Sequence, residues 1–137
     1  MRKPIKPQRL PAFTLTELLV VLVIVGILVL LALPKLMPLI SKAKSTEAEL
    51  QLGHLQTLEK SYFYAKSKYA ATLEDVGFEQ EKLTTEGGSA NYRVEIVEAT
   101  ATGFKARATA VVDFNGDGKF NVWEIDQDKN LVEVTKD

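Results

Sequence analysis

Residues 13–33 read FTLTELLVVLVIVGILVLLAL, and from Leu18 to Leu33 they contain no charged or strongly polar side chain. A helix of this length extends roughly 31 Å, which is about the hydrocarbon thickness of a bilayer. A soluble domain would have to surround such a helix on every side, and the rest of this 137-residue chain is small for that task. The stretch therefore predicts a membrane-spanning helix over residues 13–34.

Charge is distributed unevenly around this helix. The residues before it carry only basic charges, at Arg2, Lys3, Lys6 and Arg9, whereas the whole chain has a net charge of −1. This asymmetry predicts a cytoplasmic N-terminus and a C-terminal domain on the other side of the membrane. The near-neutral total argues against a general nucleic-acid binder. The absence of cysteine excludes disulfides, thiolate metal sites and cysteine nucleophiles.

Three kinds of segment combine a basic start with an apolar run. A cleaved secretory signal would have a shorter apolar core and a small-residue cleavage site after it, but here PKLMP follows at residues 34–38. A plain membrane anchor fits the hydropathy but gives no reason for Glu17, just inside the span. A third kind of segment accounts for both features.

The junction LPAFTLTELLV, residues 10–20, resembles the processing site of type IV prepilins and type II secretion pseudopilins. The resemblance implies that residues 1–12 are a basic leader, which a prepilin peptidase removes by cutting between Ala12 and Phe13. It implies that Phe13 then becomes N-methylphenylalanine. Family members usually have Gly where this chain has Ala12, and they commonly share the helix-kinking position at Pro34.

Glu17 is the one charged residue within the predicted span. Ionised groups at membrane depth cost roughly 2.5–3.5 kcal/mol and are usually functional. The family resemblance implies that Glu17 acts in assembly, by neutralising the N-terminal amine of a neighbouring subunit and so fixing the axial register. Alternatively, its carboxylate reaches the headgroups and stabilises the N-terminus of its own helix.

Residues 35–70 predict an amphipathic continuation of the helix. An apolar stripe at helical spacing indicates the face that docks on a sheet, and it consists of Ala48, Leu52, Leu55, Leu58, Tyr62, Ala65 and Tyr69. Charged residues mark the faces expected to be solvated: Lys42, Lys44, Glu47, Glu49, Glu59, Lys60, Lys66 and Lys68. The single histidine, His54, has neither a cysteine nor a carboxylate cluster near it in sequence and predicts no metal or catalytic role.

Residues 71–137 predict a small globular β domain. The segment from Thr72 to Asp75 resembles a capping box for one helical turn that stops at Gly77. Alternating apolar residues then predict antiparallel strands at 91–99, 104–112, 122–125 and 131–134. The predicted fold class is α+β. The resemblance implies the pilin-like version of it, in which a long N-terminal helix packs on a small antiparallel sheet.

Residues 113–124 read DFNGDGKFNVWE and match the calcium-loop pattern D-x-[DN]-x-[DN]-G-x5-E in full. Calcium takes about six to eight hard oxygen ligands, which alternate positions of a curled loop can supply. The predicted ligands are Asp113, Asn115, Asp117, the carbonyl of Lys119, Asn121 and a bidentate Glu124. The flanks look like strands rather than helices, so the pattern predicts a structural ion and no opening switch. The alternative is a plain turn, and Asp126 and Asp128 are spare carboxylates nearby.

The sequence shows no constellation for catalysis, and the resemblance implies a structural subunit, not an enzyme. It implies self-assembly into a homopolymeric filament, with inner-membrane assembly machinery and minor pilins as partners, and no nucleic acid. The precursor would be a single-pass protein of a bacterial inner membrane with a periplasmic domain, and it would then enter a periplasmic or extracellular filament. Calcium in place of the disulfide that many major pilins have favours a type II secretion pseudopilin that supports protein export. A surface or DNA-uptake pilus and an unprocessed membrane-anchored calcium-binding domain are the alternatives.

Overall fold

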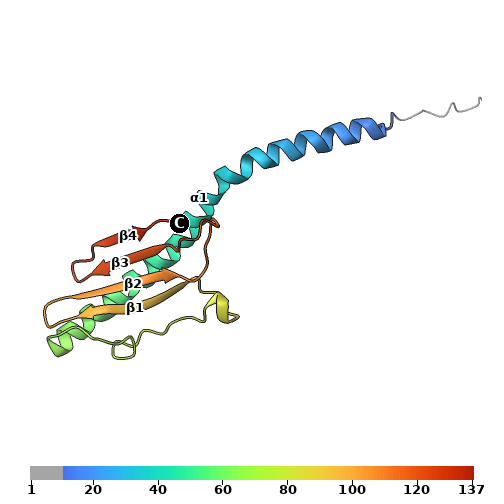
Figure 1. Cartoon of the computed structure of the whole chain (residues 1–137). Helices are drawn as coiled ribbons and strands as arrows, with labels where there is room; N and C mark the ends of the chain where they lie inside the picture. Colours follow the sequence, from blue (N-terminus) through green and yellow to red (C-terminus); the bar gives the residue numbers. More distant parts are fainter. Residues whose placement is uncertain (1–10) are drawn as a thin grey trace, which may run out of the picture. The chain divides into compact units, whose positions relative to one another are not determined.

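The computed structural model describes residues 11–137 (Figure 1). Residues 1–10, which make up most of the predicted leader, lie outside this range. The elements follow in the order α1 (Leu15–Lys66), η1 (Thr84–Glu86), β1 (Tyr92–Ala99), β2 (Phe104–Ala110), β3 (Val122–Asp126) and β4 (Leu131–Thr135). The chain divides by its internal contacts into two units, Met1–Lys35 and Leu36–Asp137.

The first unit consists, within the described range, of the apolar part of α1. Every large apolar side chain from Phe13 to Leu33 is exposed. Among residues 11–137, α1 is the one helix long and apolar enough to cross a bilayer, and the rest of the chain covers none of its most apolar stretch. The helical assignment runs through Pro34 and Pro38 without interruption. The helix therefore begins at Leu15, two residues after its predicted start, and its apolar surface is uncovered by the rest of residues 11–137.

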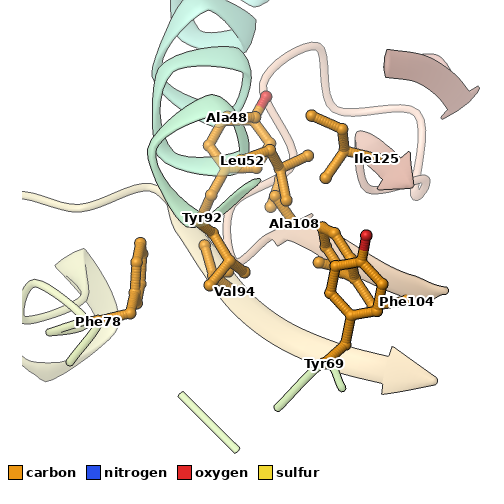
Figure 2. Close-up of a cluster of buried hydrophobic side chains, with 12 residues drawn as sticks. Ala48, Leu52, Tyr69, Phe78, Tyr92, Val94, Phe104, Ala108 and Ile125 are labelled. Carbon is orange, nitrogen blue, oxygen red and sulfur yellow. The ribbon is translucent and has the colours of Figure 1, made fainter. Parts of the chain in front are cut away.

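The second unit packs the rest of α1 against a four-stranded antiparallel sheet in the order β1-β2-β3-β4. The helix buries Ala48, Leu52 and Leu55 completely. They join one buried cluster with alternate residues of the strands, and Figure 2 shows Leu52 among sheet residues of this cluster. The sheet residues of the cluster include Tyr92, Val94, Phe104, Ala106, Ala108, Ala110 and Ile125. The α+β fold with a long N-terminal helix on a small antiparallel sheet is confirmed.

The helix ends at Lys66, three residues before the end of the predicted stripe. Ser67 adopts a left-handed backbone (φ +57°), and its N–H donates to the Phe63 carbonyl at 2.7 Å, which closes the last turn. Ala65 is exposed, so the predicted stripe is wrong there. Tyr69 is buried as predicted, but it enters the core from the segment after the helix, where its ring stacks on Phe63 with centroids 4.8 Å apart.

The predicted exposure to solvent is wrong for two carboxylates of α1. Glu59 is completely buried and accepts a hydrogen bond from the Ala70 N–H at 2.9 Å. Glu47 is half-buried and accepts bonds from the N–H and side-chain amide of Asn91, at 2.8 and 2.7 Å. Helical periodicity cannot predict these roles, because the donors lie after the helix, 11 residues past Glu59 and 44 residues past Glu47.

The remaining differences concern short connections. Residues 72–77 form turns rather than a helical turn, although the Thr72 hydroxyl does accept the Asp75 N–H at 3.3 Å. The strand β2 ends at Ala110, two residues before its predicted end at Val112, which is exposed. The 3-10 turn η1 was not predicted. The four strands otherwise lie within two residues of their predicted bounds.

Candidate functional site

The junction that carries the processing motif lies at the start of α1. Phe13 is 86% exposed, and Ala12 is exposed beside it. Thr14 and Glu17 form a reciprocal cap, in which the Thr14 N–H donates to Glu17 Oε2 at 2.7 Å and the Glu17 N–H donates to Thr14 Oγ1 at 3.2 Å. The Thr14 hydroxyl also donates to Oε2, at 3.0 Å. Glu17 thus stabilises the start of its own helix, and among residues 11–137 its Oε1 atom has no hydrogen-bond partner.

The predicted metal loop lies between β2 and β3 and is organised around Asp113. The two carboxylate oxygens of Asp113 accept hydrogen bonds from the N–H groups of Gly116 and Gly118, at 2.6 and 2.7 Å. The hydrogen bond from Gly118, with smaller help from that of Gly116, holds the pKa of Asp113 below its usual range. Both glycines have positive φ angles, +81° and +85°, which a side chain would strain.

The next two predicted ligands continue the curl of the loop. Asn115 Oδ1 accepts the Asp117 N–H at 2.7 Å, and Asp117 Oδ1 accepts the Lys119 N–H at 2.8 Å. Backbone N–H groups thus donate to side-chain oxygens of three alternate residues, Asp113, Asn115 and Asp117. The loop provides the first part of the predicted ligand set in a compact arrangement.

Asp137 joins this loop, and the sequence pattern did not include it. Its carboxylate accepts the N–H groups of Phe114 and Asn115 at 2.7 and 3.0 Å. One carboxylate oxygen each from Asp113, Asp117 and Asp137 lies within 4.8 Å of the others. Asp137 is 20 residues past Asp117, beyond the reach of any local spacing rule. Only the antiparallel path of β3 and β4 returns the chain to the loop.

The structure places Asn121 in the core rather than on the loop surface. Asn121 is completely buried. Its amide group donates to Glu133 Oε1 at 2.8 Å and to the Thr135 carbonyl at 2.9 Å, while its Oδ1 accepts the Tyr92 hydroxyl at 2.7 Å. Burial, above all other causes, raises the pKa of Tyr92 to about 12, so that its hydroxyl stays a donor. Asn121 thus links β4 to Tyr92 of β1 through side-chain hydrogen bonds.

Glu124 is likewise used elsewhere. It lies in β3 opposite Arg107 of β2, and its Oε1 accepts two bonds from the guanidinium group, at 2.9 and 2.7 Å. Asp126 is engaged at the β3–β4 turn, where it accepts the N–H groups of Asp128 and Asn130. The structure therefore brings Asp113 and Asp117 together with Asp137, and it does not bring Asn121 or Glu124 into this group.

The donor set of the loop suits calcium. Three carboxylates and the Asn115 side chain offer hard oxygens, and calcium accepts such ligands in flexible geometry. Three like charges close together also repel one another, and a divalent cation would relieve that repulsion. The residues present therefore fit a calcium ion.

Comparison with known proteins gives one informative relationship. Over 82 residues, which are 60% of this chain, the sequence is 37% identical to the type IV major pilin protein PilA of Myxococcus xanthus. The chain is similar to a type IV major pilin. The matched region covers 36% of that pilin's length, so the chain spans about a third of this relative. A scan against protein-family models gave no match. The similarity supports the pilin resemblance.

Proposed function

We propose that this protein is a subunit of a type IV pilin-like filament, anchored before assembly by residues 13–34. The observation that carries the proposal is the exposed apolar surface from Phe13 to Leu33, in a chain similar to a type IV major pilin. Such a surface requires cover from lipid before assembly and from neighbouring helices afterwards. The partners are therefore the membrane, other copies of the chain and the machinery that assembles them.

Maturation belongs to the proposal as well. A prepilin peptidase would remove residues 1–12 and create an α-amine on Phe13, which is 86% exposed and so accessible. The uncommitted Oε1 of Glu17 could then accept that amine from a neighbouring subunit while Oε2 keeps the cap on its own helix. The two roles that the sequence left as alternatives for Glu17 are thus compatible, because they use different oxygens.

Two filaments are candidates, and a different observation favours each. The similarity to a type IV major pilin favours a surface pilus. The cysteine-free chain and the acidic loop favour the type II secretion pseudopilus, in which calcium takes the stabilising role of a disulfide. In both filaments we propose a structural calcium ion held by Asp113, Asp117 and Asp137, with Asn115 and the Lys119 carbonyl as further ligands.

Mass spectrometry of the native protein, combined with a gene deletion, tests this function. The filament proposal expects a mature N-terminus at Phe13 that carries one methyl group, and loss of fibres in the deletion strain. Loss of surface fibres identifies a pilus, whereas periplasmic retention of normally exported proteins identifies a secretion pseudopilus. A native chain that still begins at Met1 would overturn the filament proposal in favour of an unprocessed anchor.

A further inference from the structure

The loop between β2 and β3 presents an exposed tip, consisting of Lys119 and Phe120. Lys119 is exposed, and Phe120 is 44% exposed although it is a large aromatic residue. The bonds from Gly116 and Gly118 to Asp113, and from the Lys119 N–H to Asp117, hold the backbone that carries the tip. The loop thus exposes a basic and an aromatic residue that are adjacent in sequence, on a backbone that hydrogen bonds hold in place.

A shallow groove of about 400 Å³ lies elsewhere on the same domain, between α1 and residues 77–81. We call it the helix groove. Its apolar lining comes from Leu50 and Phe78, His54 also lines it, and its acidic members are Glu79 and Glu81. Leu50 is 70% exposed, and the His54 ring lies 5.9 Å from the Phe78 ring. The groove therefore combines an uncovered apolar surface with two carboxylates.

The tip and the helix groove are complementary in both charge and polarity. Glu79, Glu81 and Lys119 are exposed, and none of them forms a salt bridge within residues 11–137. A lysine beside an aromatic ring matches a groove that places two carboxylates beside leucine, histidine and phenylalanine side chains. Burial of the ring would supply attraction, and the charges would set the orientation and the choice of partner.

The tip of a chain lies away from the helix groove of the same chain. Asp137, which binds the N–H groups of Phe114 and Asn115, also accepts the Ser41 hydroxyl through its carbonyl at 2.8 Å. The loop is therefore held near Ser41, and Figure 1 shows it beside the end of β4. The groove begins at Leu50, nine residues farther along α1, which corresponds to about 14 Å along the helix axis.

We propose that the Lys119–Phe120 tip of one copy docks in the helix groove of a second copy. Two different surfaces meet in this contact, so it is heterologous, and each copy keeps one tip and one groove available for further copies. Such a contact extends into an open helical assembly when its rotation does not close a ring. The inference rests on the proposed filament function, to which it adds a specific contact between globular domains.

Cysteine cross-linking within assembled filaments tests the contact directly. The chain has no cysteine, so an introduced pair has no background from native thiols. The double variant Phe120→Cys with Leu50→Cys should give a ladder of covalent oligomers on oxidation, which collapses on reduction. The matched control pairs Phe120→Cys with Val97→Cys, because Val97 is also exposed (45%) but lies on β1, outside the groove. Filaments of the double variant without a ladder above this control would overturn the contact.

Charge reversal provides a second test that needs no cross-link. Lys119→Glu should lower the yield of assembled filaments about tenfold, and Glu79→Lys with Glu81→Lys should do the same. Combining all three changes should restore assembly, whereas Lys129→Glu at the exposed β3–β4 turn should leave it unchanged. Failure of the combined variant to recover would also overturn the contact. Absence of filaments from the wild-type chain would instead overturn the proposed function, so the two failures are distinguishable.

Discussion

The two parts of α1 contain similar apolar residues but differ in their exposure to solvent. Leu22 and Leu30, in the first unit, are 59% and 72% exposed, whereas Leu52 and Leu55, in the second, are completely buried. The second part obtains its cover from the chain's own sheet. The first part has no such cover within the described chain, and we propose that lipid and other copies supply it. The difference separates a surface that folds the domain from a surface that, in the proposed filament, contacts other copies.

The carboxylates of the same helix extend this comparison. Glu17 and Glu59 each bind a backbone N–H with one oxygen, from Thr14 at 2.7 Å and from Ala70 at 2.9 Å. In both residues the second oxygen has no hydrogen-bond partner within residues 11–137. The chain encloses the free oxygen of Glu59, but Glu17 is exposed and can still meet a group from outside. Similar local chemistry therefore leaves an oxygen that no outside group can reach at Glu59 and one that an outside group can still reach at Glu17.

The largest expected effect is the loss of filaments in Glu17→Leu. This change removes the charge and improves membrane insertion, so membrane levels and peptidase cleavage should persist while filaments disappear. Electron microscopy of fibres and immunoblots of the membrane fraction measure the two outcomes. Normal filaments from this variant would refute the pairing of Glu17 with a neighbouring amine.

A matched variant separates that pairing from the capping role. Thr14→Ala removes the hydroxyl that takes part in the cap but leaves the Glu17 carboxylate in place. We expect filaments to form in this variant, because the Glu17 carboxylate and the Phe13 amine both remain. If Thr14→Ala abolished filaments as completely as Glu17→Leu, the cap alone would explain the role of Glu17.

The next largest expected effect is on the stability of the second unit, which would hold the proposed calcium ion. For the full chain in detergent, calcium at about 100 times its dissociation constant should stabilise the domain by about 2.7 kcal/mol, and chelation should remove this gain. Asp113→Ala and Asp137→Asn should abolish the calcium-dependent rise in Tm. Glu124→Gln should retain it, because Glu124 is bound to Arg107 rather than gathered at the loop.

This series distinguishes the structural ligand set from the sequence pattern. If Glu124→Gln abolished the calcium response and Asp137→Asn preserved it, the loop would bind calcium as the twelve-residue pattern describes. A wild-type chain whose melting does not depend on calcium would overturn the site altogether. Magnesium is the matched cation control and should stabilise poorly, because it prefers tight octahedral geometry and retains its waters.

The sequence predicted the fold well because the fold depends on local periodicity. The uncharged run from Leu18 to Leu33, the stripe from Ala48 to Leu58 and the alternation on β1 and β2 each record which side of an element is apolar. These patterns do not depend on where the other elements lie. They therefore predicted the long helix and the four antiparallel strands, with the errors in the bounds of these elements confined to a few residues at their ends.

The carboxylate group at the candidate site was predicted only in part, because its members are not all local. Asp113, Asn115 and Asp117 lie on one tight loop, which the glycines allow, and the spacing pattern registers them. Asp137 arrives through the pairing of β3 with β4, and the same pairing places Asn121 against Glu133 and Thr135 in the core. Residue spacing within a loop cannot predict a residue that reaches the loop only through the pairing of later strands.

The smallest expected effect tests Glu59, the enclosed counterpart of Glu17. Burial raises the pKa of Glu59 above its usual value, and the nearby charge of Asp75 adds to this, while the bond from Ala70 opposes it. A carboxyl group whose pKa is raised in the folded state contributes stability below its unfolded pKa, and this contribution is lost as the pH rises through the folded pKa. Glu59→Gln cannot ionise, so its Tm should decline less than that of the wild type over this range, by a few degrees. Thermal melts of the full chain in detergent at several pH values, with exposed Glu49→Gln as the control, measure the difference. Parallel curves for the wild type and Glu59→Gln would show that Glu59 ionises as easily inside the domain as it would in water.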